Sequence, residues 1–268
     1  LREGGFPWRT SSGWLFVTEW PGTSNVSLVS DLNDWDPRAN RASQVGSLHF
    51  AMVQEAGPMA GAKYKWFAPG NVYRSPPEAR AYGYDGFGEF GYVAPPANER
   101  YLERFDGVAA PDVLPRTLRA SLPAGFSRGD IAAYRVALFH DGQNLFNPAA
   151  PWGGWNLNQV LTDQRLHNVI VLMIDNTPNR MQEYTHAADR IFNTPYQGQA
   201  SAYLRATANN YLPFFERQYG RLTNILVAGS SLGGLVSLYF ASQQSSVLTQ
   251  FGCVVAMSPT LGWGAYDP

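Results

Sequence analysis

The sequence has little cysteine, little charge and no long hydrophobic run, and each shortage excludes a class of protein. Among 268 residues there is one cysteine, Cys253, which excludes an intrachain disulfide framework and a thiolate metal cluster. Charged residues make up 15%, the formal net charge is -1, and no basic cluster is present, so neither nucleic acid nor a membrane is expected as a partner. No apolar run approaches the roughly 18 residues of a membrane helix. The 45% of hydrophobic and 14% of aromatic residues instead indicate a globular protein with a sizeable core.

The first part of the chain is typical of a small antiparallel β-sandwich. Short runs of strand-forming residues alternate with turn clusters such as Asp34–Pro37, and helix signals are nearly absent. These runs occupy residues 14–17, 26–29, 49–53 and 62–67. A proline-bearing stretch between about residues 95 and 112 follows, and prolines suit a semi-rigid connection. We therefore expect an all-β domain over residues 1–108 and a second domain over residues 109–268.

The second part alternates apolar strand-like runs with longer helix-like segments, which predicts a doubly wound α/β/α sandwich. The runs Val169–Ile174 and Ile225–Ala228 are apolar on both faces, as buried parallel strands require. The expected strands are 116–122, 134–139, 168–174, 224–228 and 252–257. The expected helices are 156–166, 200–219 and 232–243.

The sharpest chemical signal is a G-x-S-x-G motif, Gly229 to Gly233, between an apolar strand and a helix. In that context the motif forms a nucleophile elbow, a strained turn that lifts the hydroxyl of its serine, here Ser231, above the sheet. Glycines on either side allow the strand and the helix to approach closely. The alternative is an ordinary glycine-rich turn in which the serine caps the helix. The strand and helix context favours Ser231 as a nucleophile.

A second loop, upstream of the elbow, is expected to help form an oxyanion hole. An ester-cleaving serine needs two backbone N–H groups aimed at the developing oxyanion. One comes from the residue after the nucleophile, Leu232, and the other from the loop after an earlier strand, where Gly142 or Gln143 is the candidate. The alternative is a polar turn in which Asp141 and Asn144 cap local N–H groups.

From about Arg116 to Trp263 the chain resembles the esterase family of α/β-hydrolases, which contains enterochelin (ferric siderophore) esterases, esterase D and feruloyl-esterase-like enzymes. The matching segments are His140–Phe146, Ile174–Asn176, Glu183–Thr185, Tyr211–Phe215, Gly229–Gly234 and Met257–Pro259. The resemblance implies an α/β-hydrolase fold and a serine esterase with Ser231 as nucleophile, without a metal or organic cofactor. It also implies a small-molecule ester as substrate, with a ferric siderophore or another aromatic ester first and a feruloyl or acetyl ester of a glycan second.

The segment Val26–Pro37, with Tyr64–Phe67, resembles immunoglobulin-like early-set domains of the glycogen-binding type. In glycan-binding relatives an aromatic residue at the position of Trp35, a lysine at that of Lys65 and an aromatic residue near Tyr73 face the sugar. The resemblance therefore implies a carbohydrate as a further ligand. The alternatives are that Trp35 is a packing residue, and that the domain helps to wall the substrate pocket.

The catalytic triad is incomplete in this sequence. α/β-Hydrolases place the acid and the histidine after the nucleophile, but all four histidines precede Ser231 and the only acidic residue after it is Asp267. Three explanations stay open. The acid and the histidine lie beyond Pro268, so that the hydrolase domain is cut short at its C-terminal end; the protein is a catalytically inactive ligand-binding or glycan-binding relative; or His140 or His186 substitutes as the base. We expect the first.

The remaining candidates are substrate-pocket residues. His140 lies in the oxyanion segment, and Trp155 and Trp263 suit an aromatic acyl group. Arg180 and Arg190 lie in the loop region after Asp175, and such a pair would suit an anionic ferric siderophore; the favoured alternative is that both are solvated loop arginines. No metal-binding motif such as H-E-x-x-H is present, so no metal site is expected.

Overall fold

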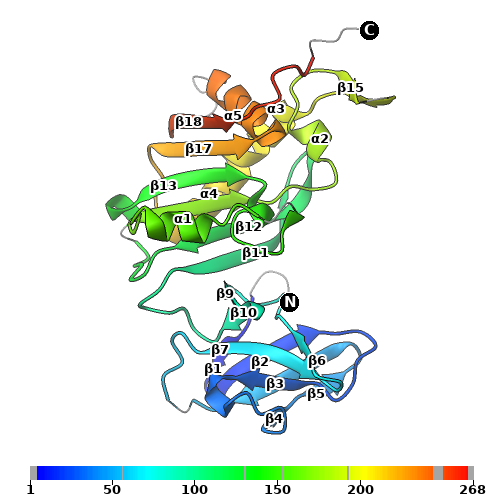
Figure 1. The fold of residues 1–268 in the computed structure, drawn as a ribbon, viewed down its shortest axis with the longest axis vertical. Helices are drawn as coiled ribbons and strands as arrows, with labels where there is room; N and C mark the ends of the chain where they lie inside the picture. The colour runs from blue at the N-terminus through cyan, green and yellow to red at the C-terminus, as the bar shows by residue number, and fades with distance from the viewer. Residues whose placement is uncertain are drawn as a thin grey trace. The chain divides into compact units, whose positions relative to one another are not determined.

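The computed structural model describes residues 5–55, 57–129, 131–151, 154–191, 193–243 and 250–264, and they form two compact units (Figure 1). The first unit comprises Leu1–Phe105, Leu122–Phe126 and Phe146–Trp155. The second comprises Asp106–Ser121, Ser127–Leu145 and Asn156–Pro268. The predicted domain boundary at residue 108 stays a prediction.

The first unit contains two antiparallel sheets. One has the order β1 (Trp8–Thr10), β2 (Gly13–Glu19), β6 (Leu48–Val53), β5 (Ser43–Val45). In the other, the first half of β11 (Tyr101–Ala110), β9 (Ala81–Asp85), β10 (Gly88–Tyr92), β7 (Lys63–Ala68), β3 (Ser27–Ser30) and β4 (Asn40–Arg41) follow one another, and β8 (Val72–Arg74) also pairs with β7.

Large aromatic side chains form the core of this unit. Phe16 of β2 meets Tyr64 of β7 edge to face, with ring centroids 4.9 Å apart, and Trp66 is fully buried beside them. The strands alternate as sandwich strands do, because His49 and Ala51 of β6 are buried while Phe50 between them is exposed. The expected β-rich first part is therefore present. Its assignment to the early-set class stays a prediction.

The second unit is built on a mostly parallel sheet of order β12 (Val113–Leu122), β14 (Val169–Ile174), β13 (Arg135–His140), β17 (Ile225–Ser230), β18 (Phe251–Met257). Only β12 runs antiparallel to its neighbour in this set, and β13, β14, β17 and β18 are mutually parallel. The five strands overlap the five that the sequence predicts. Because the four parallel strands end at the same edge, the loops that begin at Asp141, Asp175, Ser231 and Ser258 gather there.

Helices cover both faces of this sheet. They are α1 (Leu157–Asp163), α2 (Arg180–Glu183), α3 (Ala200–Ala206), α4 (Leu212–Tyr219) and α5 (Leu232–Ser242). Right-handed crossovers put α1, between β13 and β14, on the face opposite to α3 and α5, because the later connections run back across the sheet. Figure 1 shows α1 in front of the strands and α4 behind them.

One predicted helix, residues 200–219, is interrupted. A π-helical turn, Thr207–Tyr211, lies between α3 and α4. Pro213 occupies the first turn of α4 and has no N–H to donate to the preceding turn, so the backbone widens there.

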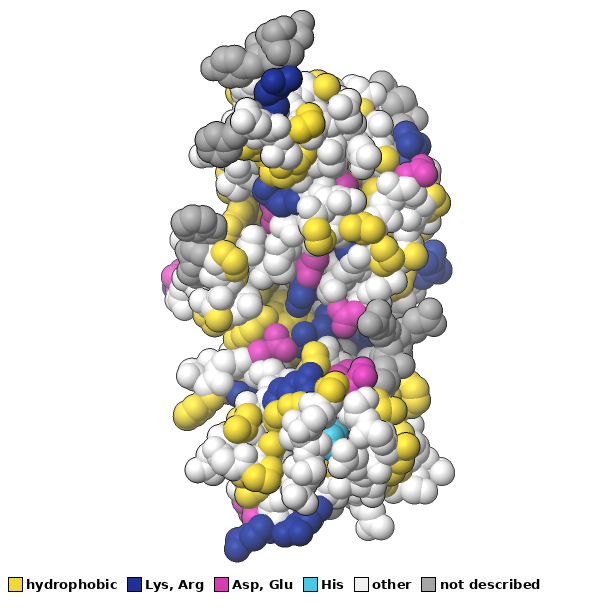
Figure 2. Space-filling view, turned by 90° about the vertical axis from the view of Figure 1, so that its right-hand side faces the viewer, with side chains coloured by type: hydrophobic (Ala, Val, Ile, Leu, Met, Phe, Trp, Pro, Cys, Tyr) yellow, Lys and Arg dark blue, Asp and Glu magenta, His cyan; other side chains and the backbone are white. Residues whose placement is uncertain are grey.

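Three short 3₁₀ turns, Asp31–Asn33, Ile131–Ala133 and Gly142–Asn144, and a small hairpin, β15 (Asp189–Ile191) with β16 (Thr194–Tyr196), complete the described elements. No helix among the described residues is long and apolar enough to cross a membrane. On the face drawn in Figure 2, basic and acidic side chains are interspersed, in keeping with the balanced net charge.

Candidate active site

Ser231 lies at the turn between β17 and α5 in a strained backbone conformation. Its φ of 57° and ψ of -122° lie outside the regions that serine ordinarily adopts, which is the geometry of a nucleophile elbow. The turn is held on both sides, because the N–H of Ser231 donates to the Met257 carbonyl at 3.0 Å and the N–H of Thr260 donates to the Ser231 carbonyl at 3.3 Å. The Ser231 side chain is exposed at the sheet edge.

Glycine is required beside the serine for steric reasons. A Cβ on Gly229 would lie 2.3 Å from the carbonyl oxygen of Gly233, so no larger residue fits where the strand passes the helix. A Cβ on Gly234 would lie 3.2 Å from both the Gly229 and the Met257 carbonyl oxygens. The glycines of the motif are therefore needed for the close packing of the strand and the helix.

The candidate oxyanion donors lie at the starts of two helical turns. Leu232 is the first residue of α5, so its N–H has no acceptor within the helix. Gly142 begins a 3₁₀ turn directly after β13, and a Cβ there would lie 2.7 Å from Met173 Cβ and 2.9 Å from Asp175 Oδ1. Gln143 follows, and its side-chain Oε1 accepts the N–H of Asn176 at 3.1 Å.

Asp141 ties this loop to the rest of the site. Its carboxylate accepts two hydrogen bonds from Arg180, at 2.7 Å from Nε to Oδ1 and 2.8 Å from Nη2 to Oδ2, and a third from the side chain of Asn176 at 2.6 Å. The other side of the carboxylate faces α5, because a Cβ on Gly233 would lie 3.1 Å from Oδ2. A negative charge is favourable beside the first turn of a helix. From the sequence, Asp141 is predicted only as a local cap, and no spacing rule links it to Arg180, 39 positions later.

A second, deeper ion pair supports the loop that carries Arg180. Arg116 of β12 donates to Glu183 of α2 at 2.7 Å, and both side chains are almost completely buried. The Arg116 guanidinium lies over the rings of Tyr203 and Tyr211, 5.1 and 5.5 Å from their centroids. Burial alone would lower the pKa of Arg116, but Tyr203 and the Glu183 carboxylate raise it, so this buried arginine stays charged. No motif in the sequence predicts a functional role for either residue.

His140 is enclosed rather than open to a substrate. It is completely buried, its Nδ1 is 2.9 Å from the Tyr203 hydroxyl, and its ring contacts Tyr184 and Phe240. Burial lowers the pKa of His140 to about 4, so the ring is neutral at pH 7. Its surroundings are those of a packed core histidine.

The other pocket candidates lie in different places. Arg180 is engaged with Asp141, which neutralises its charge. Trp263 is buried, donates from Nε1 to the Ala187 carbonyl at 2.9 Å, and packs near Tyr196. Trp155 is half-buried in the segment Phe146–Trp155, which belongs to the first unit.

A general base for Ser231 is not within hydrogen-bond distance in the described part of the chain. The side-chain partner of Ser231 Oγ is the Thr260 hydroxyl at 3.2 Å. His186 is exposed and stacks on Tyr239, and Asp267 lies outside the described residues. Among the residues described, no group of three or more His, Cys, Asp or Glu side chains is placed to hold a metal ion.

The first unit contains a separate cavity of about 630 Å³ that brings together the three glycan-binding candidates. Its lining comprises Asp31, Trp35, Lys63, Lys65, Tyr73, Asp85 and Phe87, and it is called here the Trp35 cavity.

The polar atoms of the Trp35 cavity are held in place. Trp35 Nε1 donates to Asp31 at 2.9 Å and Lys65 Nζ donates to the Phe87 carbonyl at 2.6 Å. Burial lowers the pKa of Lys65, an effect that the Asp85 and Glu89 carboxylates oppose. Tyr73 is about half exposed and Phe87 91% exposed, so two aromatic rings are open to solvent at this cavity.

Comparison with known families assigns the second unit. The family model described as "Putative esterase" matches residues 114–265, more than half of the chain, and the chain belongs to this family. The strand order and the elbow at Ser231 are those of an α/β-hydrolase. Comparison with curated proteins returned no match.

Three solved structures are similar to part of the chain. The BES protein from Bacillus cereus is 16% identical over 61% of this chain and 63% of its own, with a TM-score of 0.47. An IroE-like serine hydrolase from Shewanella oneidensis is 24% identical over 61% of this chain and 51% of its own, with a TM-score of 0.46. The ferulic acid esterase AmCE1/Fae1A from Anaeromyces mucronatus is 19% identical over 59% of this chain and 58% of its own, with a TM-score of 0.41. The chain thus spans less than two thirds of the length of each.

Proposed function

We propose that the second unit is a serine ester hydrolase with Ser231 as its nucleophile. The observation that carries the proposal is the strained backbone of Ser231 at the end of β17, with the N–H groups of Leu232 and the Gly142–Gln143 turn at the same sheet edge. The experiment that tests it is hydrolysis of p-nitrophenyl esters by the full-length gene product, with Ser231→Ala as the control.

The proposed reaction is acyl transfer in two steps. Ser231 Oγ attacks the ester carbonyl carbon while a base removes its proton, and the carbonyl oxygen becomes an oxyanion that accepts hydrogen bonds from the two N–H groups. The carbon–oxygen bond to the alcohol then breaks, the alcohol takes the proton and leaves, and water hydrolyses the acyl-enzyme. The proposal requires a base from outside the described residues, because the described neighbour of Oγ is the Thr260 hydroxyl.

For the substrate we propose an aromatic or catecholate ester, with a ferric siderophore first and a feruloyl or acetyl ester of a glycan as the alternative. The family resemblance of the sequence supports this choice. The ion pair with Asp141 weakens the case for Arg180 as an anion-binding residue, since its charge is already compensated. Relative kcat/KM values on a siderophore trilactone and on a feruloyl ester decide between the two classes.

We expect the Asp141–Arg180 pair to position the oxyanion loop. Arg180→Met should lower kcat about 10- to 100-fold while KM changes less, because a displaced donor affects the oxyanion more than the bound ester. The matched control is Arg190→Met, since Arg190 is an exposed arginine after the same strand. Steady-state kinetics with p-nitrophenyl acetate measure both constants. A fall in kcat of equal size in the two variants would contradict the positioning role.

We further propose that the first unit binds a carbohydrate in the Trp35 cavity. The specific observation is that Trp35, Lys65 and Tyr73 line one cavity together with the carboxylates of Asp31 and Asp85. Aromatic faces pack on the apolar face of a sugar ring, and charged side chains form strong hydrogen bonds with its hydroxyl groups.

Replacement of the aromatic residues tests this proposal. We expect Tyr73→Ala and Trp35→Ala each to weaken binding of maltooligosaccharides by about tenfold or more, because each removes a stacking surface. The matched control is Trp8→Ala, since Trp8 is also an exposed aromatic residue but lies on β1 in the other sheet. Isothermal titration measures the affinities. Unchanged affinity in both cavity variants, or no binding by the unaltered chain, would refute the carbohydrate site.

A further inference from the structure

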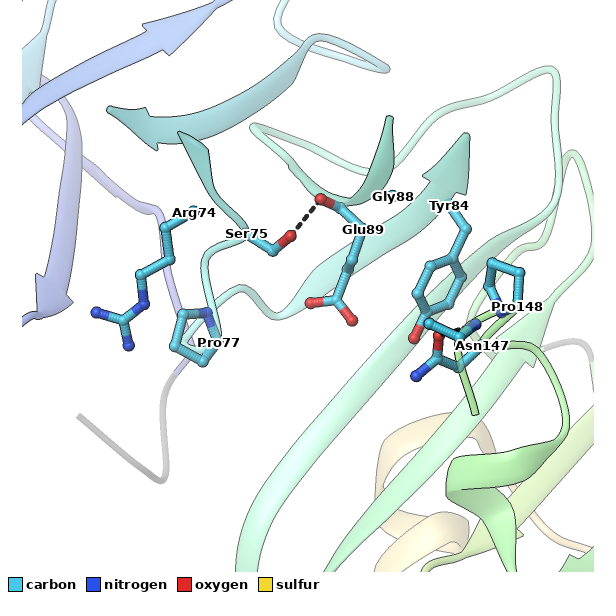
Figure 3. A pocket seen from close by; sticks show the side chains of 9 residues that line it. Arg74, Ser75, Pro77, Tyr84, Gly88, Glu89, Asn147 and Pro148 are labelled. Carbon is cyan, nitrogen blue, oxygen red and sulfur yellow. Dashed lines mark hydrogen bonds between the residues drawn. The ribbon is translucent and has the colours of Figure 1, made fainter. Parts of the chain in front are cut away.

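A second cavity, of about 350 Å³, lies in the first unit and has no part in the functions proposed so far (Figure 3). It is called here the Glu89 cavity, and the lining residues that matter are Arg74, Ser75, Tyr84, Glu89, Asn147 and Pro148. All of them belong to the first compact unit, Asn147 and Pro148 through the segment Phe146–Trp155. Its volume is at the lower end of the range for small-molecule pockets, so it suits one small ligand.

The two cavities lie on opposite sides of the same strands. On β8, Tyr73 lines the Trp35 cavity and the next residue, Arg74, lines the Glu89 cavity. On β9, Asp85 and Tyr84 divide in the same way. Because successive strand residues point to opposite faces, neither cavity is an extension of the other. The ligand of the Glu89 cavity must therefore be inferred from the residues of that cavity alone.

The Glu89 carboxylate is the central acceptor of this cavity. Glu89 of β10 pairs across the sheet with Tyr84 of β9, so the two side chains share a face. One carboxylate oxygen, Oε1, accepts a hydrogen bond from Arg104 Nη2 at 2.6 Å, which fixes the group and leaves the other oxygen for a ligand. Figure 3 shows the carboxylate projecting from its strand into the space between Pro77 and Tyr84.

Polar groups of Arg74, Ser75 and Asn147 also line this cavity. The Asn147 side-chain oxygen accepts the N–H of Ala149 at 2.9 Å, so the side-chain NH₂ of Asn147 is the group that a ligand can use. Arg74 donates from Nη1 to the Glu19 carbonyl at 2.7 Å and lies over the Trp20 ring, which holds its remaining N–H groups in place. The Ser75 hydroxyl donates to the Glu89 carbonyl and thus offers its oxygen as an acceptor.

The charges of this lining do not call for a charged ligand. Arg104 compensates the Glu89 carboxylate, and the guanidinium of Arg74 is already held by the Glu19 carbonyl and the Trp20 ring. A sugar ring meets these requirements, because its hydroxyl groups both donate and accept hydrogen bonds and its apolar face can pack on the Tyr84 ring and Pro148. We propose that the Glu89 cavity is a binding site for one neutral sugar residue, independent of the Trp35 cavity and of Ser231.

The experiment is a titration of the chain with neutral methyl pyranosides of pentoses and hexoses. Ligand-observed saturation-transfer NMR measures the binding of each one. We expect at least one of them to bind, and Glu89→Gln and Asn147→Ala each to weaken its affinity by about tenfold. Asn147→Ala leaves the Glu89–Arg104 pair intact, so it tests the site even if Glu89→Gln disturbs folding. The control is Glu55→Gln, at an exposed carboxylate that pairs with Arg9. Tyr73→Ala in the Trp35 cavity tells binding at the two cavities apart.

Glu55→Gln should bind the same pyranoside with unchanged affinity. The proposal is overturned if no neutral pyranoside binds, or if binding survives Asn147→Ala but is lost in Tyr73→Ala. It is also overturned if a uronic acid binds more tightly than the matching neutral sugar, because the Glu89 carboxylate would then not face the ligand.

Discussion

Ser231→Ala is expected to lower kcat for p-nitrophenyl acetate by at least about 10³-fold in the full-length gene product. Without Oγ no acyl-enzyme can form, and the oxyanion donors and substrate binding alone leave only a small residual rate over water. KM should change little, because the alanine leaves the backbone N–H groups of Leu232 and Gly142 in place. Initial rates over a range of ester concentrations give both constants.

The control for this experiment is Ser242→Ala, which removes an exposed hydroxyl at the last residue of α5. Its kcat should equal that of the unaltered protein. Equal rates for the Ser231→Ala variant and the unaltered protein would sink the nucleophile assignment. No hydrolysis by either, combined with binding of the ester, would favour the alternative of a catalytically inactive ligand-binding relative.

Glu183→Gln is expected to give the largest loss of stability, about 3–5 kcal/mol in the free energy of unfolding of the second unit. The substitution leaves the Arg116 guanidinium buried without a counter-charge, since 0% of its side chain is exposed. Water cannot compensate a charge at such a position. Urea denaturation monitored by circular dichroism measures the loss, provided that the variant and the unaltered protein have the same m-value.

The matched control is Asp112→Asn, which removes the acid of an exposed pair with Arg205. Asn tolerates the positive φ of position 112, and exposed pairs contribute little, so we expect a loss below about 0.5 kcal/mol. A double variant, Arg116→Met with Glu183→Leu, should recover most of the stability, because both charges are then gone. A loss below about 1 kcal/mol for Glu183→Gln would contradict this account of the buried pair.

Local patterns were sufficient for most of the secondary structure and for the elbow. The runs of residues 168–174 and 224–228 predict buried strands because both faces are apolar, and β14 and β17 occupy them. The G-x-S-x-G motif predicts a turn that only glycine permits, and the steric limits at Gly229 agree with it. The π-helical turn at Thr207–Tyr211 was missed, because one proline inside a continuous helical pattern does not reveal how the preceding turn adapts.

The two ion pairs that hold the loops of the site could not be predicted, because each is formed by residues that only the sheet brings together. Asp141 and Arg180 follow neighbouring strands, and Arg116 and Glu183 are 67 positions apart. An isolated arginine in a loop is most often solvated, so the sequence favoured a free cation at Arg180. The pairing follows from the order of β14 next to β13, which sequence periodicity does not encode.

What the sequence by itself determined is what a short segment carries: strands, helices, the strained turn at Ser231 and the esterase family. These depend on neighbours within a few residues, where spacing and side-chain size are enough. Only the tertiary structure decided which charges are compensated, that His140 is enclosed and neutral, and that the first unit has two separate cavities on opposite sides of β8 and β9. Those properties depend on burial and on distances between remote residues, and both arise only when the sheets are assembled.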